Sequence, residues 1–376
     1  MVRRSTQKET LVVKVKLACI KFAGMASSGV EKYLQTITAL LPKDKFEIDF
    51  YYTNAAPFLH SSFVHPVNDD SRLEFVKSHG INPIKIQVEA KIGNEEPYEW
   101  LNTDFWEHFN EEDYDFILTG RGGYPEYPFN LINKTKIIDT IHSFDGEDKP
   151  NIVKAILLCQ WQADKWASNG GNKNKAVVIP TIVKVPPKKT SDMRRQLSIP
   201  ENAFVYGFHQ GNREEIFSPV SLLAYNQIKN PNNYFVIMGG ANHHRALARE
   251  LGCPNIKFIE HSSSVEEIHN FLGGIDVFAH ARVDGEVCSA AIIEGLYHGK
   301  PIISHPALNM GHAEQLDGCG KMATTLNQYA EHMLQYENDK NLYQTDSNNA
   351  LKKYASSYDY KQVEEKIVRT FEEITQ

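Results

Sequence analysis

The segment VDGEVCSAAIIEGLYHGKPII, residues 283–303, reads as a turn, a helix and the beginning of a strand. It follows the strand-like run IDVFAHA, residues 275–281, so the turn occupies the loop at the carboxyl end of that strand. Ser289 is expected to cap the helix, Gly299 to end it and Pro301 to open the next strand. Ligands bind at the carboxyl ends of strands in open α/β sheets, and this loop is therefore a candidate binding site.

Two glutamates flank the start of this helix. Glu286 lies in the glycine-containing turn, and Glu294 lies inside an otherwise apolar helical segment. The unpaired N–H groups and the positive dipole end of the helix suit a phosphate group. The sequence thus predicts an anion site with a carboxylate on either side of it.

Glu294 needs a partner, because a helix that is apolar all round is expected to be buried. Burying a carboxylate without partners costs several kcal/mol. Either Lys300 or a nearby histidine neutralises Glu294, or its two oxygens accept hydrogen bonds from the hydroxyls of a sugar. The placement of charges alone leaves both interpretations open.

The same alternation of strands and helices extends over both halves of the chain. Strand-like runs are residues 12–20, 46–52, 84–90, 114–120 and 135–141 in the first half, and 204–208, 234–240, 255–261, 275–281 and 300–305 in the second. Helical runs are residues 29–41, 219–228, 243–252, 264–274 and 289–299. Strand–helix–strand units imply parallel sheets, so the predicted fold class is α/β, with two doubly wound Rossmann-like domains facing each other across a cleft.

The predicted domains are residues 1–185, 186–355 and a C-terminal helix over 356–376. A length of 376 residues exceeds one ordinary core, and the proline-rich, basic stretch 176–204 is typical of a connection between domains. The last helix carries Val363, Ile367 and Phe371 on one face, so we expect it to pack back on the domains. A dimerisation helix is the alternative.

Composition narrows the class of protein. The formal net charge of −7 argues against a nucleic-acid partner, and no apolar run reaches the length of about 20 residues that spans a bilayer. The polar beginning lacks the apolar centre of a secretory signal, and the five cysteines have no CxxC spacing. We expect a cytoplasmic monomer or homodimer whose basic N-terminal region allows peripheral contact with a membrane.

Several motifs together resemble retaining GT-B glycosyltransferases, especially glycosyltransferase family 4. GEVCSAAIIEGLYHGKPII (residues 285–303) resembles that family's glutamate–x7–glutamate motif, followed by its Gly-x-Pro. SSGVEKYL (27–34) and IIDTIHS (137–143) resemble its first loop and its strand ending in histidine. IPENAFVYGF (199–208), YFVIMGG (234–240) and NMGHAEQLDGCG (309–320) resemble segments of its second domain. The resemblance covers nearly the whole chain.

The resemblance implies a nucleoside-diphosphate sugar as donor. Glu286 would then contact hydroxyls of the donor hexose, Glu294 would bind the ribose, and Gly29 would let the first loop approach the diphosphate. The backbone N–H groups that would hold the diphosphate are those of Val287, Cys288, Ser289 and Ala290. From the residues alone, Gly29 is equally a glycine at a helix start.

Further roles are implied on both domains. His142 would lie near the acceptor and near C6 of the sugar, although an isolated histidine is more often a packed residue. The donor pocket would be lined by Asn309, Met310 and Gly311, and the base would be held near Ile259. No divalent metal and no other cofactor is implied, and no DxD motif stands in a suitable loop. The acceptor would be a glycan, a lipid or a small molecule.

One departure from the family pattern concerns its cations. The family has an arginine after the first strand of the second domain and a lysine soon after it, and both neutralise the departing diphosphate. Phe208 and Ile216 occupy those places here. Arg213 is the fixed cation that remains in the loop, and His209 could assist when protonated.

The alternative to a transferase is therefore a GT-B protein that binds a sugar nucleotide or glycan without transferring it. A nucleotide-sugar epimerase is a more remote third interpretation, because the sequence offers no convincing set of additional acid and base groups.

Overall fold

The computed structural model describes most of the chain as two compact units. The described residues are 13–53, 55–58, 61–66, 69–88, 103–120, 128–142, 149–210, 214–228, 230–240, 242–252, 255–262 and 264–375. Unit 1 comprises residues 1–157, 165–177 and 364–376, and unit 2 comprises residues 158–164 and 178–363. Each unit is thus built from separate stretches of chain, whereas the sequence suggested contiguous domains.

Unit 1 contains a seven-stranded sheet in the order β5-β2-β1-β6-β7-β8-β9. The strands are β1 (Val15–Ile20), β2 (Phe46–Tyr52), β5 (Asn82–Lys85), β6 (Phe116–Thr119), β7 (Lys136–Ile141), β8 (Ile152–Leu157) and β9 (Ala176–Val178). β1 pairs in parallel with both β2 and β6, so the order of the sheet reverses between β1 and β6. Ligands bind beside such a switch point.

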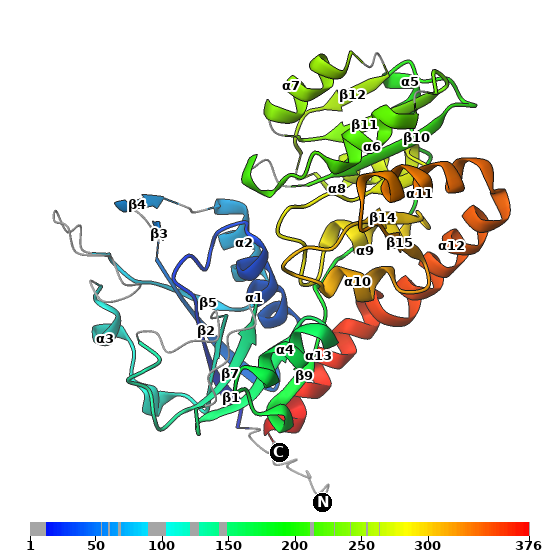
Figure 1. The fold of residues 1–376 in the computed structure, drawn as a ribbon. Helices are drawn as coiled ribbons and strands as arrows, with labels where there is room; N and C mark the ends of the chain where they lie inside the picture. The colour runs from blue at the N-terminus through cyan, green and yellow to red at the C-terminus, as the bar shows by residue number, and fades with distance from the viewer. Residues whose placement is uncertain are drawn as a thin grey trace, which may run out of the picture. The chain divides into compact units, whose positions relative to one another are not determined.

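Helices and a β-hairpin complete unit 1 (Figure 1). The helices are α1 (Gly29–Leu40), α2 (Asp70–Ser78), α3 (Phe105–His108), the end of α4 (Gln160–Ser168) and most of α13 (Tyr360–Thr375). The strands β3 (Ala55–Phe58) and β4 (Ser61–Pro66) pair as a hairpin. Ile367 and Phe371 of α13 are fully buried, and the ring of Phe371 meets that of Phe46 edge-on at 6.4 Å between centroids. The C-terminal helix therefore contributes side chains to the core of unit 1.

Unit 2 contains a six-stranded, fully parallel sheet in the order β12-β11-β10-β13-β14-β15. The strands are β10 (Phe204–His209), β11 (Asn233–Met238), β12 (Ile256–Ile259), β13 (Val277–Ala279), β14 (Ile302–Ser304) and β15 (Gly320–Met322). Its helices are α5 (Met193–Gln196), α6 (Val220–Ile228), α7 (Asn242–Leu251), α8 (Val265–Gly274), α9 (Ala290–Tyr297), α10 (Gly311–Leu316), α11 (Leu326–Asn338) and α12 (Lys340–Lys353). The strand order reverses between β10 and β13, which sets the switch point of this unit.

The predicted fold class, two doubly wound α/β domains with parallel sheets, is confirmed. One strand was misplaced by the sequence: the run 84–90 was expected to be a strand, but β5 covers Asn82–Lys85. The strand expected to end at Phe208 extends to His209. In the described part of the chain, no helix is both long enough and apolar enough to cross a membrane.

Candidate functional site

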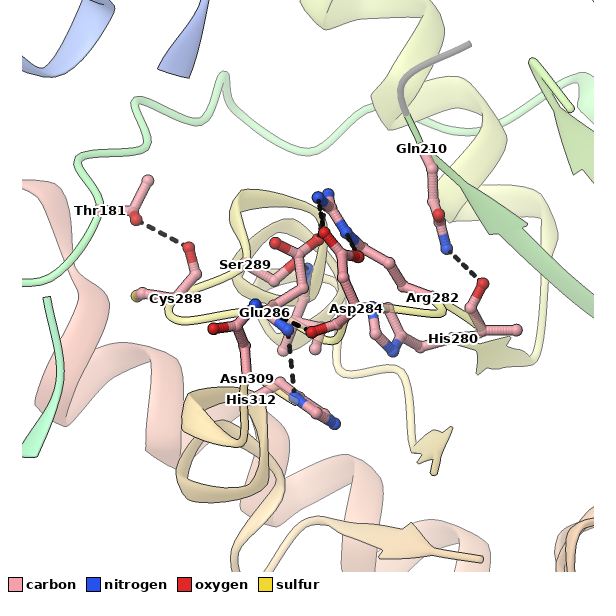
Figure 2. Close-up of polar contacts among 12 residues, drawn as sticks. Thr181, Gln210, His280, Arg282, Asp284, Glu286, Cys288, Ser289, Asn309 and His312 are labelled. Atoms are coloured by element: carbon pink, nitrogen blue, oxygen red, sulfur yellow. Dashed lines mark hydrogen bonds and ion pairs between the residues drawn. The ribbon is translucent and has the colours of Figure 1, made fainter. Parts of the chain in front are cut away.

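The candidate site lies at the switch point of unit 2. The loop that follows β13, residues 280–288 and hereafter the Glu286 loop, leaves the sheet beside the carboxyl end of β10 (Figure 2). Gln210, the residue after β10, donates from Nε2 to the carbonyl of Ala281 at 3.0 Å, and the N–H of Val283 donates to the carbonyl of Ile216 at 2.9 Å. These bonds fasten the start of the Glu286 loop to the segment that follows β10.

The Glu286 carboxylate is partly buried and is bonded on one oxygen. Oε1 accepts from Nη1 of Arg282 at 3.2 Å and from Oγ of Ser289 at 3.3 Å. Its backbone is fixed as well, because the N–H donates to Nδ1 of His312 at 3.3 Å and the carbonyl accepts from the N–H of His312 at 2.9 Å. Burial raises the pKa of Glu286 above its usual value, while Arg282 and Ser289 oppose that rise.

Arg282 and Asp284 belong to this site although the sequence did not single them out. The guanidinium donates from Nε to Oδ1 of Asp284 at 2.5 Å and from Nη2 to Oδ2 at 2.9 Å, which makes a two-pronged pair (Figure 2). The third bond, to Glu286, joins the two carboxylates through one cation. The charge pattern R-V-D-G-E was the available signal, since it puts a cation two and four residues before the acids.

Two glycines allow the segment 309–311 to lie against the Glu286 loop. A Cβ on Gly285, whose φ is +69°, would stand 2.1 Å from the carbonyl oxygen of Asn309. A Cβ on Gly311 would stand 1.8 Å from the carbonyl oxygen of Val287. Asn309 also donates from its backbone N–H and from Nδ2 to the carbonyl of Asp284, both at 2.9 Å. The structure thus brings the predicted donor-pocket residues Asn309, Met310 and Gly311 next to Glu286.

The start of α9 has both engaged and open N–H groups. Ser289 is the N-cap, and its Oγ accepts from the N–H of Ile292 at 3.4 Å. The N–H of Ser289 itself already donates to Oε1 of Gln315 at 2.8 Å. Among the described residues, none accepts a hydrogen bond from the N–H groups of Val287, Cys288, Ala290 or Ala291. Of the four amides expected to face a diphosphate, those of Val287, Cys288 and Ala290 are therefore available.

Glu294 lies on a face of α9 that is less buried than the sequence suggested. Ile292, Ile293, Gly295 and Leu296 are buried, but Ala290 is exposed and the Glu294 side chain is 15% exposed, so the expectation of a helix buried on all sides is wrong. Oε2 of Glu294 lies 3.2 Å from Nε2 of His209, without the alignment of a hydrogen bond. Lys300 donates instead to the carbonyl of Ile275 at 2.7 Å. Of the two expected partners, the histidine is the one in place.

The predicted cation positions of the family are filled by core residues. Phe208 is fully buried and its ring packs against those of Phe217 and Phe235, while Ile216 is 5% exposed. Arg213 lies outside the described residues. Ile259 ends β12, and its carbonyl accepts from the N–H of Gly239 at 2.9 Å. Within the described ranges, no group of three His, Cys, Asp or Glu side chains is placed to hold a metal ion.

The remaining predicted residues lie at the switch point of unit 1. Gly29 is the first residue of α1, and a Cβ added there would meet no atom within 4 Å. His142 directly follows β7, lies 3.3 Å from Oγ1 of Thr140 through Nε2, and meets the ring of Tyr33 edge-on. Desolvation and the charge of Lys21 lower the pKa of His142 to about 3, so its imidazole is neutral at pH 7.

Lys21 is a further residue that the sequence did not indicate. It follows β1, donates from Nζ to the carbonyl of Gly120 at 3.2 Å, and lies 3.7 Å from Oε1 of Glu31. The ammonium group thus joins the carboxyl ends of β1 and β6, the two strands between which the sheet order reverses. Unit 1 therefore holds a fixed cation beside the neutral His142.

Comparison with known proteins gives structural neighbours only. No family model and no curated protein matches the sequence. Anabaena HepE, solved with UDP and glucose, is 16% identical over 95% of this chain and 99% of its own, with a TM-score of 0.69. Sucrose-phosphate synthase from Thermosynechococcus elongatus is 14% identical over 96% of this chain and 99% of its own, with a TM-score of 0.69. A glycosyltransferase from Rickettsia africae is 15% identical over 96% of this chain and 99% of its own, with a TM-score of 0.70. The chain has the fold of these proteins over nearly its whole length, which is the GT-B fold expected from its motifs.

Proposed function

We propose that the protein is a retaining glycosyltransferase that moves a hexose from a nucleoside-diphosphate sugar to a hydroxyl group of a glycan, lipid or small-molecule acceptor. The observation that carries this proposal is the pairing of Glu286 with the start of α9. A partly buried carboxylate, bonded on Oε1, lies beside N–H groups of Val287 and Ala290 that have no acceptor among the described residues. A hexose hydroxyl and a phosphate are the ligands that suit these two groups.

From the diphosphate at the start of α9, the rest of the nucleotide would extend along α9 and the carboxyl end of β10. Glu294, next to His209, would bind the ribose hydroxyls, and Ile259 would lie near the base. HepE was solved with UDP and with UDP-glucose, so UDP-glucose is the first donor to test. The acceptor side is assigned to unit 1, where His142 and Lys21 lie at its switch point.

In the proposed reaction, the bond between the anomeric carbon and the phosphate oxygen breaks and its electron pair leaves with the diphosphate. The acceptor oxygen forms its bond to the anomeric carbon from the same face, and its proton passes to the departing phosphate. The N–H groups at the start of α9 would stabilise the charge that develops on the diphosphate, and we propose Arg213 as the cation that assists them. We propose that no divalent metal takes part.

A binding protein without transfer is the second candidate. The burial of Phe208 and Ile216 supports it, because neither position can present a cation to a departing diphosphate. Loss of a single hydrogen-bond donor from an oxyanion site costs roughly 3–4 kcal/mol of transition-state stabilisation, and a missing cation removes stabilisation of the same kind. Turnover decides between the two candidates.

The test is a donor panel. UDP-, GDP-, ADP- and TDP-sugars are incubated with the protein, with and without EDTA, while nucleotide release and thermal stabilisation are recorded. A transferase releases nucleotide from one donor class irrespective of EDTA, and Glu286→Gln lowers that release at least about 100-fold. Glu331→Gln, an exposed site on α11, serves as the matched control and keeps full activity. Stabilisation by a donor without release, even with acceptors present, selects the binding protein.

A further inference from the structure

The Glu286 carboxylate is held asymmetrically. Both side-chain donors that reach it among the described residues, Arg282 and Ser289, bond to Oε1. Oε2 has no hydrogen-bond partner among the described residues, and the side chain is 20% exposed, so this oxygen is the one open to a ligand. A carboxylate fixed through one oxygen presents the other in a defined direction.

Arg282 is fixed in turn by two independent contacts. Its backbone forms an isolated antiparallel bridge with Phe217, so the residue is tied to the segment after β10. Its guanidinium is forked onto both oxygens of Asp284, whose own carbonyl accepts two bonds from Asn309. Glu286 is bonded to His312 through its backbone. Arg282, Asp284 and Glu286 are therefore each anchored to a different part of unit 2, at Phe217, Asn309 and His312. Few alternative arrangements of the guanidinium satisfy all these contacts.

We infer that Asp284 and Arg282 are positioning residues of the transfer reaction: Asp284 orients Arg282, and Arg282 holds the Glu286 carboxylate through Oε1, so that Oε2 is directed at the donor sugar. This inference rests on the proposed function and goes beyond it, because it assigns the loop's own ion pairs to the reaction. Arg282 contributes as a guanidinium, since three of its five N–H groups are used in bonds to the two acids.

Substitutions of the two residues should have opposite effects on the ionisation of Glu286. The positive charge of Arg282 lowers the pKa of Glu286, whereas the negative charge of Asp284 raises it. Removing Arg282 therefore moves the acid limb of activity to higher pH, and removing the charge of Asp284 does not. The other titratable groups on this loop and on the elements packed against it are Cys288, His280 after β13 and His312 of α10, together with Glu214 and Glu215, which precede Ile216 in the segment after β10.

The experiment measures kcat, KM and the pH profile for Arg282→Met, Arg282→Lys and Asp284→Asn. Arg282→Met should lower kcat about 100-fold with a small change in KM, as expected for a misplaced reacting group, and should raise the acid limb by about one pH unit. Arg282→Lys should keep the acid limb at its wild-type pH, because the positive charge is retained, but its kcat should stay below that of the wild type. Asp284→Asn should lower kcat about tenfold without raising the limb. Arg195→Met, which breaks an exposed pair with Asp192, should change nothing.

A readout that needs no turnover separates this inference from the proposed function. Infrared difference titration of wild type against Glu286→Gln follows protonation of that carboxyl directly, and Arg282→Met should raise its midpoint by about one pH unit. Absence of nucleotide release from any donor would contradict the proposed function while this titration still tests the ion pairs. An unchanged midpoint in a folded Arg282→Met protein, or loss of donor binding with kcat intact, overturns the inference. If Arg282→Met does not fold, Arg282→Lys and Asp284→Asn decide through kcat: the inference expects both variants to be slower than the wild type, and wild-type kcat in either folded variant overturns it.

Discussion

At the scale of single residues, the site depends on close approach between backbones. Gly311 has no room for a side chain, because a Cβ would overlap the carbonyl oxygen of Val287. Gly311→Ala must therefore push the segment 309–311 away from the Glu286 loop. We expect a loss of roughly 3 kcal/mol in unfolding free energy and strongly reduced donor binding, measured by urea unfolding and calorimetry.

Gly295→Ala is the matched control for this prediction. Gly295 lies within α9, and the nearest atom to an added Cβ is Cδ1 of Ile302 at 3.7 Å, an ordinary contact. Because alanine favours a helix over glycine by about 1 kcal/mol, this variant should be as stable as the wild type or more so. Equal stability of Gly311→Ala and wild type would contradict the packing described here.

The sequence identified acids at the site better than their partners. Glu286 and Glu294 were conspicuous because carboxylates are rare in apolar segments, and the structure gives both a nearby cation or imidazole. Arg282 was missed because its role depends on a bridge to Phe217, more than sixty residues away in the chain. Contacts of this kind follow from the order of strands in the sheet and are not visible in local spacing.

At the scale of elements, the N-cap of α9 has two tasks. Ser289 caps the helix through the N–H of Ile292 and also donates to Glu286. Ser264 caps α8 through the N–H of Glu267 at the same length, 3.4 Å, without touching the site. Both Ser289→Ala and Ser264→Ala should cost about 1 kcal/mol of stability, but only Ser289→Ala should also lower kcat.

Thermal unfolding and donor turnover of the two variants check this prediction side by side. The comparison isolates the bond to Glu286, since loss of the cap is common to both proteins. Equal turnover in the two variants would mean that the Ser289 hydroxyl serves the helix alone.

Element boundaries depended on neighbours that local pattern does not reveal. β5 ends at Lys85 because its partner β2 ends at Tyr52, so the apolar residues after Lys85 have no strand beside them. β10 continues to His209 because β11 continues to Met238. The alternation of strands and helices, by contrast, follows from periodicity within each segment, and most of it was predicted correctly, although β8, β9 and β15 were not predicted.

At the scale of the whole molecule, the C-terminal helix contributes to the stability of unit 1. Phe371 is fully buried and packs against Phe46. Phe371→Ala should lower the free energy of unfolding by about 3–5 kcal/mol, measured by urea denaturation. Glu373→Ala, at an exposed position of the same helix, should leave it nearly unchanged. Similar stability of both variants would contradict the packing of α13 in unit 1.

The most direct test of the central claim is a proton NMR time course of the protein with UDP-glucose and a panel of hydroxyl acceptors. The predicted result is decay of the donor's anomeric signal, matched by a new α-anomeric signal on the acceptor and by free UDP, and loss of both changes in Glu286→Gln. A donor signal that broadens through binding but never decays, with this and every other nucleotide sugar, would contradict glycosyl transfer.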